Sequence, residues 1–525
     1  MSVRWRGLCW LIALLLVVAA CSAETSTETS EPFSSTTQSE VTSSTTGGAT
    51  TTEGQPATGG AMTVALAGEP TTLDLGEASF VPTNMILLYN VVEPLLYADS
   101  DGLHPLLADS WDVSDDGLTY TFHLVEATFH DGTELTADDV VFTFNRHRES
   151  ENFPYGSLDL IETITAVDDR TVEIGLTNPS NAFLRDMARG AGIVLNEDSI
   201  DLAGEAPVGT GPFQVTEWQR DQFISIVAFE GYWGEPAQLD EVTWRFIEDQ
   251  NAAVSALQAG DVDVLARLEA PERARELADD PNFQVMEQAS DDFWSVFINN
   301  AAPPLDDQRV RQAIVHAIDK QAYVDATFGG FGFPTCGWLS VDNYAYEEYC
   351  PYEYDPEAGA ALLAEAGYAD GLTLSMRGIP VVQPQSELVL AQLAEVGITV
   401  ENSVQDPPEY FAEVVSTDTP DFEITVLGWP DWNALQSVVC PPTWWIGYCD
   451  PEVSDLLSQA DLVVDEEQQI DLFRQANRIL TDDAVMAPLF NSSYITVYSN
   501  EFDGFEGSSY DGRFDIRSAN MVGTG

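Results

Sequence analysis

The chain has 525 residues, which predicts two or three lobes instead of one compact domain. With 87 acidic and 20 basic residues, its formal net charge is −67. This charge excludes nucleic acid as a partner and docking on anionic lipid through a basic patch, because both need clustered lysine and arginine. Hydrophobic residues make up 44% of the sequence, enough for a large buried core.

The N-terminus has the pattern of an export signal. Arg4 and Arg6 precede an apolar run over residues 8–20, which is too short for a membrane span of about 20 residues. The run ends in Val-Ala-Ala before Cys21, a pattern that resembles the bacterial lipobox, in which the cysteine is lipidated. We therefore expect residues 1–20 to be a signal peptide and Cys21 to anchor the protein by lipid to the outer face of the cell membrane. An ordinary export signal with an incidental cysteine is the alternative.

The next segment, residues 21–60, has the composition of a disordered tether. Serine and threonine supply 20 of the 39 residues from 22 to 60. Such a segment cannot bury enough apolar surface to fold. As a flexible coil it would span roughly 35 Å, which suits a folded domain held near a membrane.

From Ala61 onward, hydrophobic periodicity predicts alternating strands and helices. Strands are predicted at residues 62–67, 118–124, 223–229 and 239–247. Helices are predicted at residues 251–259, 309–328, 355–366, 388–396 and 470–480, and a further helix begins after Thr136 as N-cap. Because strands and helices alternate without a short repeat, the predicted fold class is α/β.

Four cysteines follow the tether, an even number that predicts two disulfides in an exported protein. They are Cys336, Cys350, Cys440 and Cys449. Three pairings are possible, and we favour Cys336 with Cys350 and Cys440 with Cys449, since each pair closes a short loop. A zinc site is the alternative, but CxxC spacing and nearby histidines are absent from this sequence. We expect no metal and no cofactor.

Six stretches of the chain resemble, in the same order, family 5 of the extracellular solute-binding proteins, which are receptors of peptide and nickel ABC importers. They include "FHDGTELTADDVVFTFNR", "PVGTGPFQVTEW" and "PLDDQRVRQAIVHAIDK". The six stretches lie at residues 110–146, 207–218, 231–264, 304–320, 354–368 and 427–480. One such run would be weak, but six in order are specific.

The resemblance implies a type II periplasmic-binding-protein clamshell with two lobes and the extra subdomain of the peptide-binding family. By that analogy, residues 61–98, 209–300 and 491–525 build lobe I, residues 99–208 build the extra subdomain, and residues 301–490 build lobe II. A receptor of this kind binds its ligand between the lobes. The ligand favours the closed form, which the membrane permease recognises.

The motif that starts at Gly428 is the candidate for solute recognition. Trp429 and Trp432 flank Asp431, so the carboxylate would lie between apolar walls and would pair well with a primary ammonium. In peptide-binding members of the family, an aspartate at this place takes the peptide amine, so the resemblance points to Asp431. The alternative is that Asp431 only satisfies backbone donors in a loop.

Other ligand contacts are expected by analogy. A peptide carboxylate needs an arginine, and Arg377 lies near the place where dipeptide-binding relatives carry one. Main-chain groups around Thr210, Gly211 and Gly428 are expected to bond an extended ligand backbone, as in strand addition.

Together these features predict a monomeric, non-catalytic receptor of an ABC importer that captures peptides or peptide-like solutes and delivers them to permease and ATPase subunits. The same fold with a sugar, polyamine or metal chelate as ligand is the alternative. A hydrolase is a more remote one, because the sequence has no GxSxG, HExxH, SxxK or Walker A motif. The acidity has two interpretations: adaptation to saline surroundings, which the even spread of acids favours, or a bias of uptake toward cationic solutes.

Overall fold

The computed structural model describes the chain from residue 59 to residue 522 with short gaps. The described residues are 59–77, 81–99, 102–150, 153, 156–416, 420–430, 435, 437–441, 445–463, 465–507 and 512–522. The expected signal peptide, Cys21, most of the tether, Asp431 and Trp432 lie outside this part of the chain. Within it, no helix combines the length and apolar character that a bilayer crossing requires.

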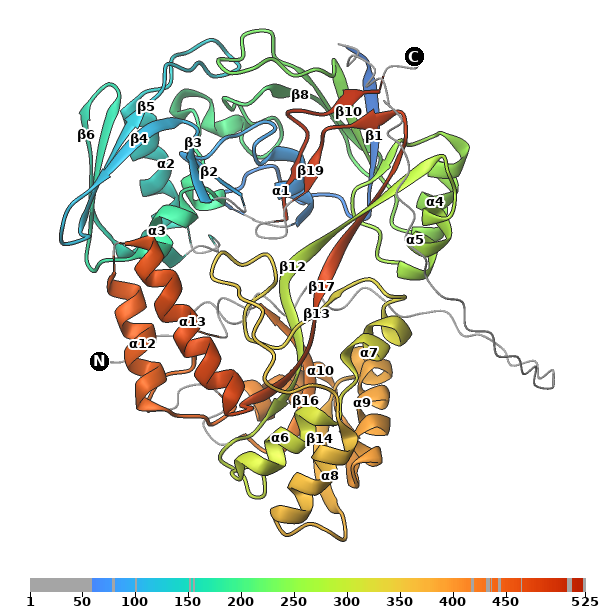
Figure 1. Ribbon diagram of the computed structural model, residues 1–525. Coiled ribbons are helices and arrows are strands. Elements are labelled where there is room, and N and C mark those ends of the chain that lie inside the picture. The colour runs from blue at the N-terminus through green and yellow to red at the C-terminus, as the bar shows by residue number, and fades with distance from the viewer. Residues whose placement is uncertain are drawn as a thin grey trace, which may run out of the picture.

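One 11-stranded sheet runs through the whole molecule (Figure 1). Its strand order is β15-β14-β16-β12-β17-β11-β1-β10-β9-β8, and β13 pairs with β17 at the side. The strands are β1 (Ala61–Leu66), β8 (Phe213–Gln219), β9 (Phe223–Ala228), β10 (Glu241–Phe246), β11 (Val264–Leu265), β12 (Phe283–Ile298), β13 (Phe333–Pro334), β14 (Leu372–Gly378), β15 (Ile398–Val404), β16 (Ile424–Pro430) and β17 (Met486–Ser499).

Strands β12 and β17 join the two halves of the molecule. They have 16 and 14 residues, pair antiparallel, and cross from the upper to the lower half in Figure 1. Their register shifts between Ala289 and Phe293, so the ladder is interrupted where the strands pass between the halves. The remaining strands of the sheet lie on one side or the other of this crossing.

A separate four-stranded sheet packs beside the upper half. Its order is β4-β5-β7-β6, with β4 (Ala108–Val113), β5 (Thr119–Leu124), β6 (Ile161–Asp168) and β7 (Thr171–Leu176). Helix α2 (Ala137–Glu149) covers it and buries Phe144 in the same hydrophobic cluster as Phe122 of β5. Thr136 caps this helix as predicted, since Asp139 accepts a hydrogen bond from the Thr136 amide at 2.9 Å.

The other helices pack around the sheet, and three short hairpins complete the upper half. The helices of the upper half are α1 (Val81–Leu87), α3 (Asn181–Asp186), α4 (Gln250–Ala259) and α5 (Pro271–Ala278). Those of the lower half are α6 (Gln308–His316), α7 (Lys320–Thr327), α8 (Pro356–Glu365), α9 (Gln383–Glu395), α10 (Pro407–Tyr410), α12 (Pro451–Leu462) and α13 (Glu466–Asp482). The hairpins are β2 (Leu96–Asp99) with β3 (Gly102–Pro105), β18 (Phe502–Asp503) with β21 (Asn520–Met521), and β19 (Glu506–Gly507) with β20 (Phe514–Asp515).

The single helix predicted at residues 309–328 is wrong. The chain forms two helices there, α6 and α7, which are separated by the three residues from Ala317 to Asp319. The Asp319 carboxylate accepts a hydrogen bond from the Ala322 amide at 2.9 Å and caps α7. Apolar periodicity continues across the break, but a side-chain cap inside the run starts a new helix axis.

The other predicted elements are present, with shifted ends. Helix α9 begins at Gln383, five residues before the predicted start at 388, and α13 extends at both ends of the predicted 470–480. Asp355 caps α8 as predicted, through the Ala358 amide at 3.0 Å. The structure contains two disulfides, Cys336–Cys350 and Cys440–Cys449, each with its Cα atoms 5.2 Å apart.

Candidate functional site

The candidate recognition motif lies at the end of β16, beside the crossing of β12 and β17. The run Ile424–Pro430 is rich in β-branched and apolar residues, which favours a strand, and it pairs antiparallel with β12. In this ladder Gly428 is opposite Trp294, and a Cβ at Gly428 would meet the indole at 3.0 Å. Glycine therefore lets Trp294 lie across the strand at this point.

Trp429 forms one aromatic wall of this region. It is partly buried, and its ring centroid lies 6.1 Å from that of Trp445. Trp445 in turn packs on Phe297 at 5.0 Å and on Phe422 at 5.3 Å, so the wall is continuous with the core of the lower half. Asp431 follows Pro430 directly in the sequence but lies outside the described residues, as does Trp432.

The interrupted part of β12 lies next to this motif. Asp292 is opposite Pro430 in the ladder, and Phe293 is opposite Trp429. Burial raises the pKa of the Asp292 carboxyl, and the charge of Arg267 opposes this rise in part. The crossing strands therefore bring a partly desolvated carboxyl group close to the recognition motif.

The turn that contains Thr210 and Gly211 lies in the upper half and is held by internal bonds. Thr210 is fully buried, and its hydroxyl donates to Glu93 Oε2 at 2.9 Å. The Gly211 amide donates to the Val91 carbonyl at 3.0 Å, and its carbonyl accepts from His130 Nε2 at 2.9 Å. A Cβ at Gly211 would lie 2.6 Å from a backbone carbonyl, so glycine is required for this close approach.

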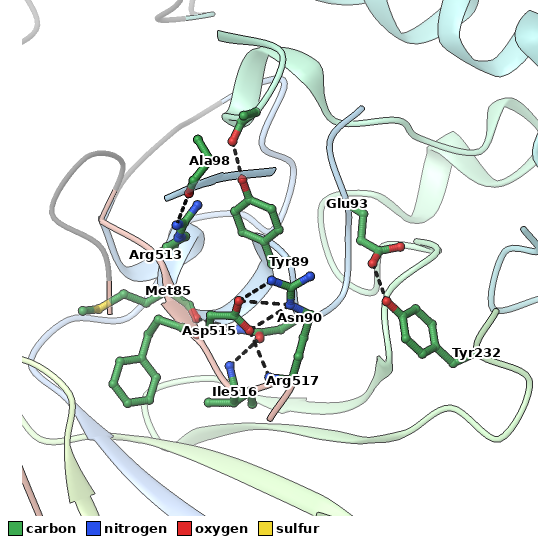
Figure 2. A network of polar contacts seen from close by, with 12 residues as sticks. Met85, Tyr89, Asn90, Glu93, Ala98, Tyr232, Arg513, Asp515, Ile516 and Arg517 are labelled. Carbon is green, nitrogen blue, oxygen red and sulfur yellow. Dashed lines mark hydrogen bonds and ion pairs between the residues drawn. The ribbon is translucent and has the colours of Figure 1, made fainter. Parts of the chain in front are cut away.

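Glu93 is the centre of the bonds around that turn. It accepts hydrogen bonds from the Tyr232 hydroxyl at 2.7 Å, the Trp233 indole at 3.0 Å and the Thr210 hydroxyl at 2.9 Å. Figure 2 shows Tyr232 pointing at the carboxyl group. Burial raises the pKa of Glu93 from 4.5 to about 7, and the three hydrogen bonds and Arg517 oppose the rise. Sequence reasoning missed this residue, because a lone glutamate gives no sign of its burial.

A second network in Figure 2 attaches the C-terminal segment to the upper half. Asn90 is fully buried, donates to the Phe514 carbonyl at 2.8 Å and accepts from the Ile516 amide at 3.0 Å. Arg517 forms a bidentate ion pair with Asp515, with Nη2 at 2.6 Å from Oδ2. These bonds hold residues 513–517 in place without engaging the recognition motif.

Arg377 does not lie beside Gly428 and Trp429, the described residues of the recognition motif. Its guanidinium bonds the Asp421 carboxylate at 2.8 Å and the Asp421 carbonyl at 3.1 Å. Arg377 follows Met376, which pairs with Ile424 of β16. At about 3.3 Å per residue, Arg377 lies roughly 13 Å from Trp429 along the strand direction.

A surface hollow is also present away from the crossing strands. It lies at the start of α13 and is lined by Asp465, Glu467, Gln468, Ile470, Asp471 and Arg474. These side chains are mostly charged and belong to α13 and its N-cap, so the hollow does not have the mixed apolar and polar lining of a solute site.

Comparison with known proteins identifies the family to which this two-lobed α/β fold belongs. Residues 102–440 match the family described as bacterial extracellular solute-binding proteins, family 5 Middle. The chain belongs to this family of extracellular solute-binding proteins.

Two relatives and one solved structure show how far the similarity extends. The dipeptide-binding protein of Escherichia coli (strain K12) is 29% identical over 82% of this chain and 87% of its own length. The glutathione-binding protein of Pectobacterium atrosepticum is 30% identical over 76% of this chain and 82% of its own. The structure of HbpA2 from Haemophilus parasuis has a TM-score of 0.81 at 24% identity, covering 88% of this chain and all of that chain, and it shows the fold alone.

Proposed function

We propose that this protein is the solute-binding receptor of an ABC importer and that it captures peptides or peptide-like solutes between its lobes. The bound form then delivers the solute to a membrane permease that works with ATPase subunits. The observation that carries the proposal is the similarity, over three quarters of the chain or more, to relatives named for binding a dipeptide and glutathione. Two lobes joined by the two crossing strands β12 and β17 suit a closing motion around such a ligand.

In this proposal Asp431 pairs with the ammonium of the peptide, and Trp429 and Trp432 form apolar walls beside it. Gly428 and its neighbours in β16 bond the extended ligand backbone. Thr210 and Gly211 position the opposite wall, because the Gly211 main-chain groups already have internal partners. Arg377 takes a ligand carboxylate only if its bond with Asp421 is broken.

The remaining assignments concern location and assembly. We propose that Cys21 is lipidated, that residues 22–60 act as the tether, and that the receptor works as a monomer on the outer face of the membrane. The lobe borders 61–98, 209–300 and 491–525 for lobe I, 99–208 for the extra subdomain and 301–490 for lobe II remain part of the proposal.

A thermal-shift screen followed by calorimetry tests the proposed function. The panel holds di- to pentapeptides, single amino acids, sugars, polyamines and Ni²⁺. A ligand at about 100 times its dissociation constant adds about 2.7 kcal/mol to the unfolding free energy, which gives a measurable shift. We expect peptides to shift the melting temperature, and a shift produced only by sugars or polyamines would remove the peptide assignment.

The same assay tests the role of Asp431. We expect Asp431→Asn to weaken peptide binding by about tenfold or more, since a charge-assisted hydrogen bond is lost. An N-acetylated peptide should bind equally weakly to both proteins. Asp455→Asn, which removes one charge from the exposed face of α12, is the control and should bind as the unaltered protein does. Equal affinities for Asp431→Asn and the unaltered protein would contradict the assignment.

A further inference from the structure

The carboxyl group of Asp292 belongs to the interrupted part of the ladder between β12 and β17. Ala289 is opposite Ser493 and Phe293 is opposite Asn491, so three residues of β12 face the single residue Ser492. Asp292 is the last of these three, and it is also opposite Pro430 of β16. The bulge therefore places Asp292 in the crossing strands that join the two halves, beside the recognition strand.

The backbone of the bulge is held by hydroxyl groups. The Ser290 and Ser492 hydroxyls are hydrogen-bonded to each other at 2.7 Å, and both lie 3.4 Å from the Asp292 carbonyl, which accepts from the hydroxyl whose proton is not used between them. The Asp292 amide donates to Ser290 Oγ at 3.1 Å. These bonds are made by the main chain of Asp292, and its carboxylate takes no part in them.

The Asp292 carboxylate has no bonding partner among the residues that the structure describes. No hydrogen bond or ion pair joins its oxygens to a side chain or amide of that part of the chain. The charge of Arg267 lowers the pKa of Asp292, but the Arg267 guanidinium pairs with Glu269 at 3.3 Å and lies 4.8 Å over the Tyr494 ring. Asp292 is thus a partly buried acceptor whose charge is unmatched within this region.

An unmatched, partly buried carboxylate is costly to a folded protein unless something pairs with it. Burial raises the pKa of Asp292, which is the direction expected when water has been removed and no donor has replaced it. A solute that brings an ammonium or guanidinium to this place would supply the missing partner.

We propose that Asp292 is a specificity-determining residue that binds a second positive group of the solute, so that the receptor prefers peptides with a lysine or arginine side chain. The inference rests on the proposed function, in which Asp431 takes the peptide ammonium and Asp292 is left for a basic side chain. Asp292 belongs to the crossing strands that join the lobes. It therefore keeps its place between the lobes each time they close around a solute. One residue of this acid-rich chain would thus make the receptor prefer solutes with a second positive charge.

Calorimetry with matched peptides tests this inference. The probes are Lys-Ala-Ala, norleucine-Ala-Ala, which has a side chain of similar length without charge, and 1,5-diaminopentane. We expect the unaltered protein to bind Lys-Ala-Ala about tenfold tighter than norleucine-Ala-Ala, and Asp292→Asn to reduce that ratio to near one. The affinity for norleucine-Ala-Ala should change less than about threefold, which shows that the variant is folded and binds peptide.

Each other outcome has a definite meaning. A ratio near one in the unaltered protein, or a ratio that survives in Asp292→Asn, overturns the inference and leaves the proposed function standing. Binding of the diamine alone, lost in Asp292→Asn, supports the role of Asp292 and removes the peptide assignment. If none of the three probes binds, both the inference and the proposed function are overturned. Asp455→Asn is again the control, because it removes an exposed charge of the same kind and should keep the ratio of the unaltered protein.

Discussion

Glu93 makes the folding stability of the upper half depend on pH. Its carboxyl group is completely enclosed and accepts three hydrogen bonds, yet its pKa rises to about 7 because burial outweighs the donors. A group whose pKa is 4.5 in the unfolded chain and about 7 in the folded chain binds its proton more tightly in the folded state. Its contribution to stability is fully present below pH 4.5 and is lost as the pH rises through 7.

We therefore predict that Glu93→Gln makes the unfolding free energy less dependent on pH between about 5 and 8. The amide keeps an acceptor for Thr210 and Trp233, and the Tyr232 hydroxyl can rotate to accept from the new amide nitrogen. The shift of about 2.5 pKa units corresponds to about 3 kcal/mol in the unaltered protein. Denaturant titrations at several pH values measure the slope. An unchanged slope in the variant would show that other groups determine it.

His130 acts in the opposite direction. Burial lowers its pKa from 6.5 to about 4, while its Nε2 donates to the Gly211 carbonyl. The folded state resists protonation, so stability is lost as the pH falls below 6.5 toward 4. Glu93 and His130 meet at the same turn, and their opposing trends predict a stability maximum at weakly acidic pH for this region.

At the scale of elements, the break between α6 and α7 shows the limit of periodicity. The apolar spacing continues from one helix to the next, yet Asp319 starts a separate helix by capping Ala322. A local hydrogen bond at one residue therefore decides an element boundary that the hydrophobic pattern does not mark.

We predict that Asp319→Ala lowers the unfolding free energy by about 1 kcal/mol, the usual cost of losing an N-cap. The control is Asp325→Ala, an exposed position within the body of α7, which removes the same charge without removing a cap. Guanidinium denaturation of both variants measures the difference. Equal stabilities for the two variants would mean that the cap does not stabilise α7.

The sequence predicted where strands lie but not which of their residues are buried or how the strands pair. The strands predicted at residues 62–67 and 223–229 are present at Ala61–Leu66 and Phe223–Ala228, because the apolar runs that predict them are local. The bulge at Asp292 was not, because it arises from pairing with β17, about 200 residues further along the chain. Its only signal is an acidic pair, Asp291 and Asp292, inside an otherwise apolar strand segment.

At the scale of the whole molecule, an ion pair links helix α3 of the upper half to helix α13 of the lower half. Arg185 of α3 pairs with Glu466 at the start of α13, and its guanidinium carbon lies 3.4 Å from the centroid of the Tyr344 ring. Figure 1 shows α3 next to α12 and α13. Arg185 is almost fully buried, whereas the side chain of Glu466 remains about half exposed.

We predict that Arg185→Ala favours separation of the two halves. The loss of a partly buried charge pair of about 1 kcal/mol would weaken solute binding about fivefold, because the closed form becomes less populated. Small-angle X-ray scattering without ligand should give a larger radius of gyration than the unaltered protein. Arg309→Ala, at an exposed pair with Asp307, is the control and should leave both measurements unchanged.

The net charge of −67 makes a second prediction for the whole molecule. Screening of repulsion among the acids should raise the melting temperature between low salt and about 1 M NaCl. Calorimetric melting at increasing salt measures it. A melting temperature that is flat over this range would contradict adaptation to saline surroundings as the reason for the acidity.

The sequence by itself determined the α/β class, the family and the helix caps at Thr136 and Asp355, because these depend on local periodicity, motif order and short-range hydrogen bonds. Only the tertiary structure decided that Thr210 is bound to Glu93, that Arg377 is paired with Asp421, and that Asp292 has no partner among the described residues. The physical reason is that desolvation and pairing are set by residues that lie far away in the sequence and meet only when the strands cross. Roles that depend on charge are therefore decided at the scale of the folded molecule.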